Sequence, residues 1–376
     1  MTRRDWIASL AGAGVSLAAG ARPRAACVMN VYTPNSHADV FLSRLLDGYR
    51  LNGAWNSPRL ETVAFYVDQF PYNDMAREQA AEYGIRICKS VAEAIDGVDA
   101  IAVIGEHGQY PRSPLGNFKY PRKRYFDEIT QVFERSGRVI PLFNDKYLAY
   151  EWADARAMYE RVRDLGIPFL CGSTLPWTWR RPPLEFAPGM QFDELIVISC
   201  GDLEEHAYHG IELLQSAAEV RRGGETGVAA VRYLEGVEVW KIAPELRKAA
   251  LARRINPPPE DHGAKPEAFL VRYADGLRAA ILHLNSKTRD YLFAARLRGN
   301  PRAQATCFYI GLYTHAHWGF LVRAFEDLAL SRREQMPVER TLVANGILLA
   351  GLESRRKGGA WIDTPHLDVR YSWPRA

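Results

Sequence analysis

The alternation of short apolar segments with amphipathic segments between residues 27 and 173 is the feature that most limits what this chain can fold into. The short segments have the aliphatic composition of strands, and the segments between them carry apolar residues at helical spacing. In the last of these, Ala155, Met158 and Val162 form one buried stripe, and Gly166 follows as a helix stop. Such alternation predicts a parallel sheet with right-handed crossovers, as in a Rossmann-type nucleotide-binding domain.

The two halves of the chain differ in the elements that the sequence predicts. In the first half we expect strands at 27–32, 62–67, 85–88, 100–104, 139–143 and 168–171, and helices at 38–49, 74–83, 91–95, 125–136 and 154–165. In the second half we expect strands at 192–200, 227–233, 267–273, 277–285, 304–313 and 367–373, and helices at 316–329 and 338–356. Asp275-Gly276 is a hairpin signal between two of these strands. The second half is therefore predicted to be α+β, with a mostly antiparallel or mixed open sheet.

Length and charge set the domain organisation and exclude some partners. The 376 residues suffice for two domains, and the Pro- and Trp-rich segment 175–188 marks the crossover. We divide the chain into a leader at 1–26, a Rossmann-like domain at 27–173 and a substrate and oligomerisation domain at 174–376. The net charge is +4, of which the first 26 residues carry +3, so neither a nucleic acid nor an anionic membrane is an expected partner.

The N-terminus has the layout of an export signal. Arg3-Arg4 precedes a moderately apolar run at 6–19, and small residues suited to cleavage follow. The run is too short and too rich in Gly and Ala for a transmembrane helix of about 20 residues. The segment resembles a twin-arginine signal, with Trp6 where Phe is usual. We expect a periplasmic or otherwise exported protein that is free of the membrane once the signal is removed; an ordinary amphipathic N-terminus is the alternative.

Cysteine and histidine spacing gives no sign of a metal or a disulfide framework. The five cysteines are dispersed and none forms a CxxC pair. His315-Ala316-His317 has two possible ligands, but no carboxylate or cysteine stands at the usual ligand spacing. No metal site is therefore predicted.

The loops after the predicted strands hold the candidate cofactor-binding residues. The first turn, 30–37, lacks the glycines that let a backbone approach a pyrophosphate, yet Asn35 and Ser36 there can cap the helix and donate to a phosphate. A helix cap alone is an equal alternative. Asp68 ends the second strand, where a carboxylate accepts from a ribose hydroxyl and favours NAD over NADP. Glu106 and His107 follow the fourth strand and face the cofactor by topology.

Several segments resemble the glucose–fructose oxidoreductase and inositol dehydrogenase family (Gfo/Idh/MocA). The resemblance runs through nearly the whole chain after the leader, but the family's motifs are altered: its Glu-Lys-Pro is Asp145-Lys146-Tyr147 here. It covers 76–85, 98–101, 139–149, 154–156, 179–182 and 346–358. The family fold implies a Rossmann domain followed by an α+β domain, and its members commonly pair through the second-domain sheet, which makes a homo-oligomer an expectation.

The resemblance also implies roles for individual residues. Lys146 matches the lysine that contacts the nicotinamide ribose and positions the reacting hydroxyl, and His209 matches the family's acid/base histidine. Glu205 lies one helical turn before His209, on the same face. A carboxylate beside an imidazole raises its pKa and fixes its tautomer, which suits proton transfer. Arg180 lies in the arginine segment that opens the family's second domain and is a candidate cofactor contact.

Two functions follow from these observations. The first is an oxidoreductase that acts on a hydroxyl of a sugar, polyol or glycoside, with a tightly held NAD or NADP. The second is a non-redox binding or accessory protein on a Rossmann scaffold that has lost the dinucleotide. The missing glycines favour the second, whereas Asp68, Lys146 and His209 together favour the first.

Overall fold

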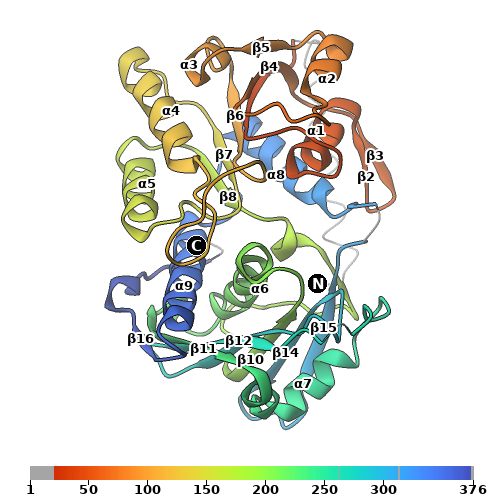
Figure 1. Ribbon diagram of the computed structural model, residues 1–376, viewed down its shortest axis with the longest axis vertical. Helices are drawn as coiled ribbons and strands as arrows, with labels where there is room; N and C mark the ends of the chain where they lie inside the picture. The colour runs from red at the N-terminus through yellow and green to blue at the C-terminus, as the bar shows by residue number, and fades with distance from the viewer. Residues whose placement is uncertain (1–20, 262, 312–313, 374–376) are drawn as a thin grey trace, which may run out of the picture.

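The computed structural model describes residues 21–261, 263–311 and 314–373, except for the side chain of Glu205. These residues form two domains, one above the other in Figure 1. Residues 1–20, which hold most of the predicted export signal, lie outside the described residues. No helix in the described ranges combines the length and the apolar character needed to cross a membrane.

The first domain is built on a six-stranded parallel sheet, as the alternating pattern predicts. The strand order is β5-β4-β1-β6-β7-β8, and every neighbouring pair is parallel. Every residue of β6 is buried, because helices cover both faces of the sheet, and this explains its continuous apolar sequence. The strands are β1 (Arg24–Met29), β4 (Glu61–Val67), β5 (Arg86–Cys88), β6 (Ala100–Ile104), β7 (Leu142–Asp145) and β8 (Phe169–Gly172).

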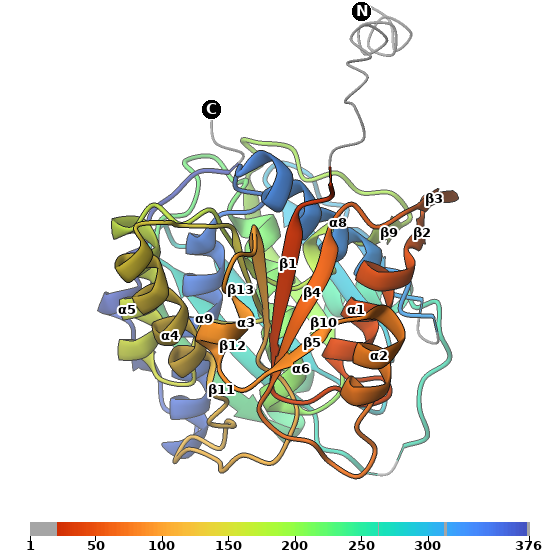
Figure 2. The ribbon, with the colours of Figure 1, turned by 90° about the horizontal axis from the view of Figure 1, so that it is seen from above.

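The helices of the first domain form two layers, one on each face of its sheet (Figure 2). One layer contains α1 (His37–Asp47) and α2 (Ala76–Tyr83), and the other contains α3 (Val91–Ala94), α4 (Arg122–Ser136) and α5 (Trp152–Asp164). A short hairpin of β2 (Tyr49–Leu51) and β3 (Ala54–Asn56) follows α1.

The second domain is an eight-stranded mixed sheet, which confirms the predicted α+β class. Its order is β16-β11-β12-β13-β10-β14-β15-β9, and only the pair β10–β13 is parallel. The predicted turn at Asp275-Gly276 joins β12 to β13, with Gly276 in the left-handed region at φ +88°. The strands are β9 (Trp179–Arg181), β10 (Phe192–Ser199), β11 (Val228–Glu235), β12 (Glu267–Tyr273), β13 (Arg278–His283), β14 (Tyr291–Leu297), β15 (Gln304–Tyr309) and β16 (Ile362–Asp363).

The helices of the second half lie in three places. α6 (Leu203–Ala218) and α9 (Val338–Arg356) pack on the sheet face that is turned toward the first domain, and α7 (Pro244–Leu251) packs on the outer face (Figure 1). α8 (Trp318–Ser331) returns to the first domain, where its apolar face joins the core of α1. α8 therefore belongs to the first domain in space, although it follows the strands of the second domain in the sequence.

Some predicted elements differ from the structure. β1 begins at Arg24, three residues earlier than expected, because Ala25 and Ala26 are fully buried and pair with strands on both sides. The strand predicted at 367–373 is wrong: a 3-10 turn at Pro365–Leu367 and a single bridge at Tyr371 stand there. The outer edge of β11 is paired with β16, so residues 367–373 do not add a strand to β11.

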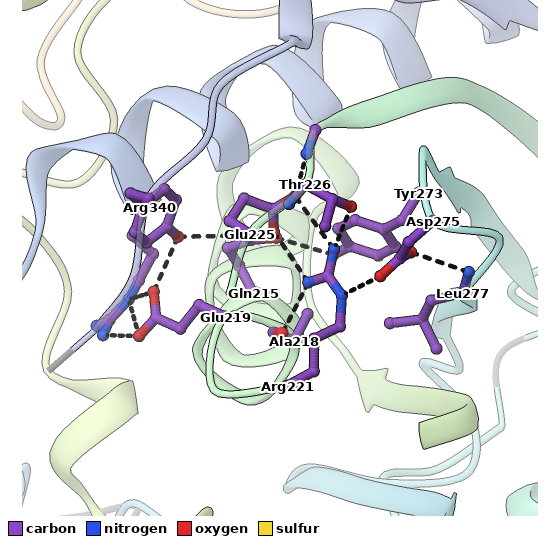
Figure 3. Close-up of polar contacts among 12 residues, drawn as sticks. Gln215, Ala218, Glu219, Arg221, Glu225, Thr226, Tyr273, Asp275, Leu277 and Arg340 are labelled. Atoms are coloured by element: carbon purple, nitrogen blue, oxygen red, sulfur yellow. Dashed lines mark hydrogen bonds and ion pairs between the residues drawn. The ribbon is translucent and has the colours of Figure 1, made fainter. Parts of the chain in front are cut away.

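A buried polar network joins α6 to α9 and to the C-terminal segment (Figure 3). Arg340 of α9 forms a double ion pair with Glu219, and Tyr371 donates to Glu219 at 2.8 Å. Arg221 pairs with Glu225 at 3.3 Å and with an aspartate of the β12–β13 turn at 2.7 Å. We call this set the second-domain network; its members are Gln215, Glu219, Arg221, Glu225, Tyr273, Asp275, Arg340 and Tyr371.

Candidate active site between the two domains

A cleft opens at the carboxyl ends of β1, β4 and β6. It has a volume of about 680 Å³ and is lined by the loops that follow these strands, including Asn35, Ser36 and His107. The strand order reverses between β1 and β6, and such a switch point is where open α/β sheets bind their ligands. Three of the residues predicted to face a cofactor thus share one cleft.

The first turn of the cleft satisfies its own hydrogen bonds. Ser36 caps α1, because its hydroxyl accepts from the backbone N–H groups of Thr33 at 3.2 Å and Asp39 at 3.3 Å. Asn35 has φ +60°, and its N–H donates to the Asp39 carboxylate at 2.7 Å. The helix-cap interpretation of Ser36 is therefore confirmed, and a carboxylate occupies the first turn of the helix.

Asp68 is bound within the chain. It accepts hydrogen bonds from Tyr66 at 2.9 Å and Tyr110 at 2.7 Å, and it forms an ion pair with Arg124. Burial alone would raise the pKa of Asp68, but the hydrogen bonds from Tyr110, Arg124 and Tyr66 lower it below the ordinary value. Its carboxylate is thus ionised and already holds three donors.

Lys146 lies directly after β7, where the sheet meets the second domain. Its ammonium group pairs with Glu106 at 2.8 Å, and the other oxygen of Glu106 pairs with Arg122. The three side chains are between 1 and 4% exposed. Lys146 has φ +60°, a left-handed backbone that costs a lysine about 1 kcal/mol and that tends to occur at functional sites. We call Lys146, Glu106 and Arg122 the Lys146 cluster.

Arg122, the first residue of α4, is a member of this cluster that sequence reasoning missed. Its guanidinium also lies over the ring of Tyr147 at 4.2 Å. Gly105 makes room for it, since a Cβ there would approach Cγ of Arg122 to 2.7 Å. The signal in the sequence was weak: an arginine among the basic residues of a long loop looks like a solvated one.

Four histidines gather around Lys146. The ring centroid of His37 lies 5.3 Å from that of His107 and 6.5 Å from that of His209, and His206 lies 6.4 Å from His209. Burial first, and the charge of Lys146 second, lower the pKa of each ring; the pKa values of His107 and His206 fall to about 4. All four imidazoles are therefore neutral at pH 7.

His209 comes to this site from the second domain, on α6. Its Nδ1 is buried and has no hydrogen-bond partner within the described ranges, and its ring lies 6.1 Å from that of Tyr291. Lys146 is close enough to contribute to its lowered pKa, so the structure brings together the two residues predicted to carry the chemistry. The side chain of Glu205, the predicted partner of His209, lies outside the described residues.

His37 and Asp145 form a second pairing that the sequence did not predict. His37 is the first residue of α1, and its Nδ1 lies 2.5 Å from Oδ2 of Asp145, the last residue of β7. In the sequence the two residues are 108 positions apart, and nothing in either segment indicates the contact. The pair lies beside Lys146 and therefore belongs to the same site.

Arg180 does not line the cleft. It lies on β9 at the edge of the second sheet, donates to the carbonyl of Pro176 at 3.1 Å and packs over the rings of Phe186 and Phe308. His315 and His317 have ring centroids 6.3 Å apart, and no group of three His, Cys, Asp or Glu side chains among the described residues is placed to hold a metal ion.

Solved structures of several dehydrogenases match nearly the whole chain. GenD2 of gentamicin A biosynthesis, solved in complex with NAD, matches with a TM-score of 0.59 at 11% identity over 92% of this chain and 97% of its own. The myo-inositol 2-dehydrogenase of Lactobacillus plantarum matches with 0.58 at 11% identity, over 91% and 99%. The UDP-N-acetylglucosamine 3-dehydrogenase GnnA of Acidithiobacillus ferrooxidans matches with 0.55 at 10%, over 89% and 99%.

The chain has the two-domain fold of these dehydrogenases. The fold predicted from the sequence resemblance is thereby confirmed, over both domains and at identities where only the arrangement of elements is shared. No protein-family model matches the sequence, and no curated protein sequence does.

The cleft fits a dinucleotide in position and size but departs from the usual phosphate site. It lies at the switch point, touches the N-terminus of α1 and is large enough for a nucleotide. Hydrogen bonds within the turn use the N–H groups of Thr33 and Asn35, so a pyrophosphate would meet mainly the first N–H groups of α1. Asn35 and Ser36 would contact the phosphates, and His107 would lie toward the nicotinamide end.

Proposed function

We propose that this protein is an oxidoreductase that acts on a hydroxyl of a sugar, polyol or glycoside and holds a nicotinamide dinucleotide tightly in the cleft. The observation that carries the proposal is that His209 of the second domain lies among first-domain residues at the switch point: its ring centroid is 6.5 Å from that of His37, which is 5.3 Å from that of His107 in the cleft lining. Lys146 follows β7 at the same edge of the sheet. The matching structures include dehydrogenases whose names specify inositol and a UDP-sugar. Another matching structure, GenD2, was solved with NAD.

The chain's own residues would handle the substrate hydroxyl. His209 is a neutral imidazole at pH 7, which is the form that accepts a proton, and its buried Nδ1 has no partner among the described residues. Lys146, held by Glu106 at 2.8 Å, would donate to the hydroxyl oxygen and orient it toward His209. A bound nicotinamide supplies the hydride acceptor or donor.

We favour NAD over NADP, and export over a cytoplasmic location. No lysine or arginine is among the described residues that line the cleft, and Arg124 beside Asp68 is already paired with that carboxylate, so a 2′-phosphate would meet a carboxylate and no unpaired cation. The twin-arginine segment of the sequence favours export, and an exported enzyme meets little free nicotinamide nucleotide. Tight retention and regeneration of the cofactor within each turnover follow from that setting.

The first test is to look for the dinucleotide itself. Protein purified without added cofactor is denatured, and the supernatant is assayed enzymatically for NAD(H) and NADP(H). The proposal predicts close to one equivalent of NAD(H) per chain. If none is released, and none binds to the intact protein at millimolar concentration, the redox function is wrong.

The second test removes the proposed acid/base. Replacing His209 by Ala is expected to lower turnover of a sugar or polyol substrate about 10²- to 10⁴-fold, since this is the usual contribution of a positioned proton-transfer group. His366 is exposed and is not among the residues that line the cleft, so His366→Ala serves as the matched control. Unchanged turnover in the His209 variant would remove this residue from the mechanism.

A binding or accessory protein without a dinucleotide is the second candidate, and one observation favours it. The turn that would hold a pyrophosphate contains Pro34 and Asn35 instead of glycines, and the Asp39 carboxylate is bonded to its backbone. A negative charge at that helix end opposes an anionic ligand. In this case the cleft would bind a neutral sugar, and Asp39→Asn would leave its affinity unchanged.

A further inference from the structure

The pair of His37 and Asp145 has a geometry that the proposed function does not use. Nδ1 of His37 lies 2.5 Å from Oδ2 of Asp145, and the two residues belong to α1 and β7. The imidazole is 16% exposed and the carboxylate 1%, so the pair runs from the protein interior toward open space. A buried carboxylate behind a partly exposed imidazole is the arrangement that orients a histidine for proton transfer.

Packing holds the imidazole of His37 in one orientation. Trp318 of α8 meets it edge to face, with ring centroids 4.6 Å apart, and His107 does so at 5.3 Å. The remaining oxygen of Asp145, Oδ1, is buried and has no hydrogen-bond partner in the described part of the chain. A purely structural carboxylate would be expected to fill both oxygens, as Glu219 does in the second-domain network.

The charge state of the pair suits a base. Burial raises the pKa of Asp145 to about 6, and burial together with Lys146 lowers the pKa of His37. Near neutral pH the pair is therefore a carboxylate and a neutral imidazole: Nδ1–H donates to Asp145, and the lone pair of Nε2 is left to accept a proton. The other titratable and charged groups around His37 are Lys146, Arg122, His107, His206 and His209.

We propose that His37, oriented by Asp145, is a second proton-transfer residue of this site. It comes from the first domain and lies beside His209 of the second, with ring centroids 6.5 Å apart and an angle of 29° between the rings. Nε2 of His37 accepts a proton from a ligand hydroxyl and releases it to water, while Asp145 stabilises the imidazolium. That the ligand is a polyhydroxyl compound rests on the proposed function, whereas the base itself does not.

The experiment labels the intact, purified protein with diethyl pyrocarbonate, which acylates neutral, accessible imidazoles. Peptide mass mapping gives a rate constant for each histidine. His37 is expected to be labelled, and Asp145→Asn is expected to slow its labelling about tenfold, the lower end of what loss of a histidine's carboxylate partner costs. An asparagine amide can donate to Nδ1 and so place the proton on Nε2. The exposed His366 is the internal reference and should keep its rate.

A second measurement keeps the proposal testable if the Asp145→Asn variant does not fold. The proton between His37 and Asp145 should give a resonance far downfield of ordinary imidazole N–H signals in the native protein, and His37→Gln should remove it. Absence of that resonance, failure of His37 to react, or an equal rate in Asp145→Asn would each overturn the proposal. Failure to find a nicotinamide nucleotide would contradict the redox function, but the expected labelling rates and the expected resonance of His37 would stay the same.

Discussion

Two buried polar clusters of this chain use the same kinds of side chain but differ in how they are satisfied. In the second-domain network, Arg340 and Tyr371 both donate to Glu219, and no buried polar side-chain atom of the network lacks a partner in the described part of the chain. At the interdomain site, polar atoms of His107, Asp145 and His209 are buried and have none.

The difference separates a cluster that stabilises the fold from one that is available to a ligand. A buried polar atom without a partner costs about 1–3 kcal/mol, so a chain that bonds every atom of one cluster gains little by leaving several without partners in another. Of these residues His107 lines the cleft, Asp145 ends β7 and His209 comes from α6, so a ligand bound where the two domains meet would supply the missing partners. The comparison predicts opposite effects of substitutions in the two clusters.

The largest effect is expected from removing one partner of the second-domain network. Arg340→Leu leaves the carboxylate of Glu219 buried without its cation and should lower the free energy of unfolding by about 3–5 kcal/mol. Urea denaturation of the variant measures it. The double variant Arg340→Leu/Glu219→Leu removes both charges and should recover most of the loss. If the free energy of unfolding of Arg340→Leu lay within 1 kcal/mol of that of the native protein, the second-domain network would not be the stabilising cluster.

Acid should destabilise the fold through the neutral imidazoles. The pKa values of His107 and His206 are about 4 in the folded chain, below the ordinary 6.5, so the unfolded chain binds more protons between these values. Stability is therefore complete above pH 6.5 and is lost as the pH falls toward 4, by about 1.4 kcal/mol per pH unit for each imidazole. The raised pKa values of Asp145 and Glu212 act in the opposite direction and offset part of the loss.

Four buried imidazoles with lowered pKa values outnumber these two carboxyls with raised ones, so a net loss of stability is expected between pH 7 and pH 5, measured by urea denaturation at both values. His206→Gln should reduce this loss by about 2 kcal/mol, since the imidazole contributes about 1.4 kcal/mol per pH unit between pH 6.5 and pH 5. A stability that rises on acidification would show that the raised carboxyl pKa values outweigh the imidazoles.

A substitution at the interdomain site should raise the free energy of unfolding, whereas Arg340→Leu lowers it. His209→Leu removes a buried nitrogen that has no partner among the described residues, and should raise the free energy of unfolding by about 1 kcal/mol while it abolishes turnover. Thermal unfolding of the ligand-free protein is the measurement. A loss of 2 kcal/mol or more would mean that His209 contributes to the fold, and the contrast between the two clusters would fail at that point.

The smallest effect is expected from an ion pair on the surface. Arg156 and Glu160 lie one turn apart on α5, 2.6 Å apart and both about half exposed. Arg156→Ala should change the free energy of unfolding by no more than about 0.5 kcal/mol, because water and salt screen such pairs. A larger loss would show that exposure is a poor guide to which ion pairs of this chain matter.

The first-domain sheet could be predicted because the local sequence of its strands is enough to identify them. β6 and β8 are short apolar runs, and β8 is preceded by α5 with its buried stripe and by Gly166 as a helix stop. β14 and α7 were missed: the apolar run of β14 lies next to a run of polar residues, and α7 begins with Pro244 in a segment rich in charge. Their positions are decided by packing on β10, which local sequence does not encode.

The site could be predicted only where a motif survived. Lys146 and His209 were found through resemblance, and Ser36 through its position at a helix start. Asp145, Arg122 and His37 were missed as site residues because their roles arise from contacts between segments far apart in the chain. Glu106 was placed correctly at the end of β6, but it holds Lys146 and Arg122 instead of facing the cleft openly.

The early start of β1 limits where a leader could be removed under the proposed export. Arg24, Ala25 and Ala26 were assigned to the leader, yet in the structure they open the central strand, which pairs on both sides. A signal peptidase needs an extended substrate that it can reach, so cleavage within this strand would remove part of the sheet's centre. The cut that leaves the sheet whole falls before Pro23, and Ala19-Gly20-Ala21 offers the small residues for it. If export occurs as proposed, the mature form is expected to begin at Arg22, and intact-mass measurement of protein from the exported fraction tests this.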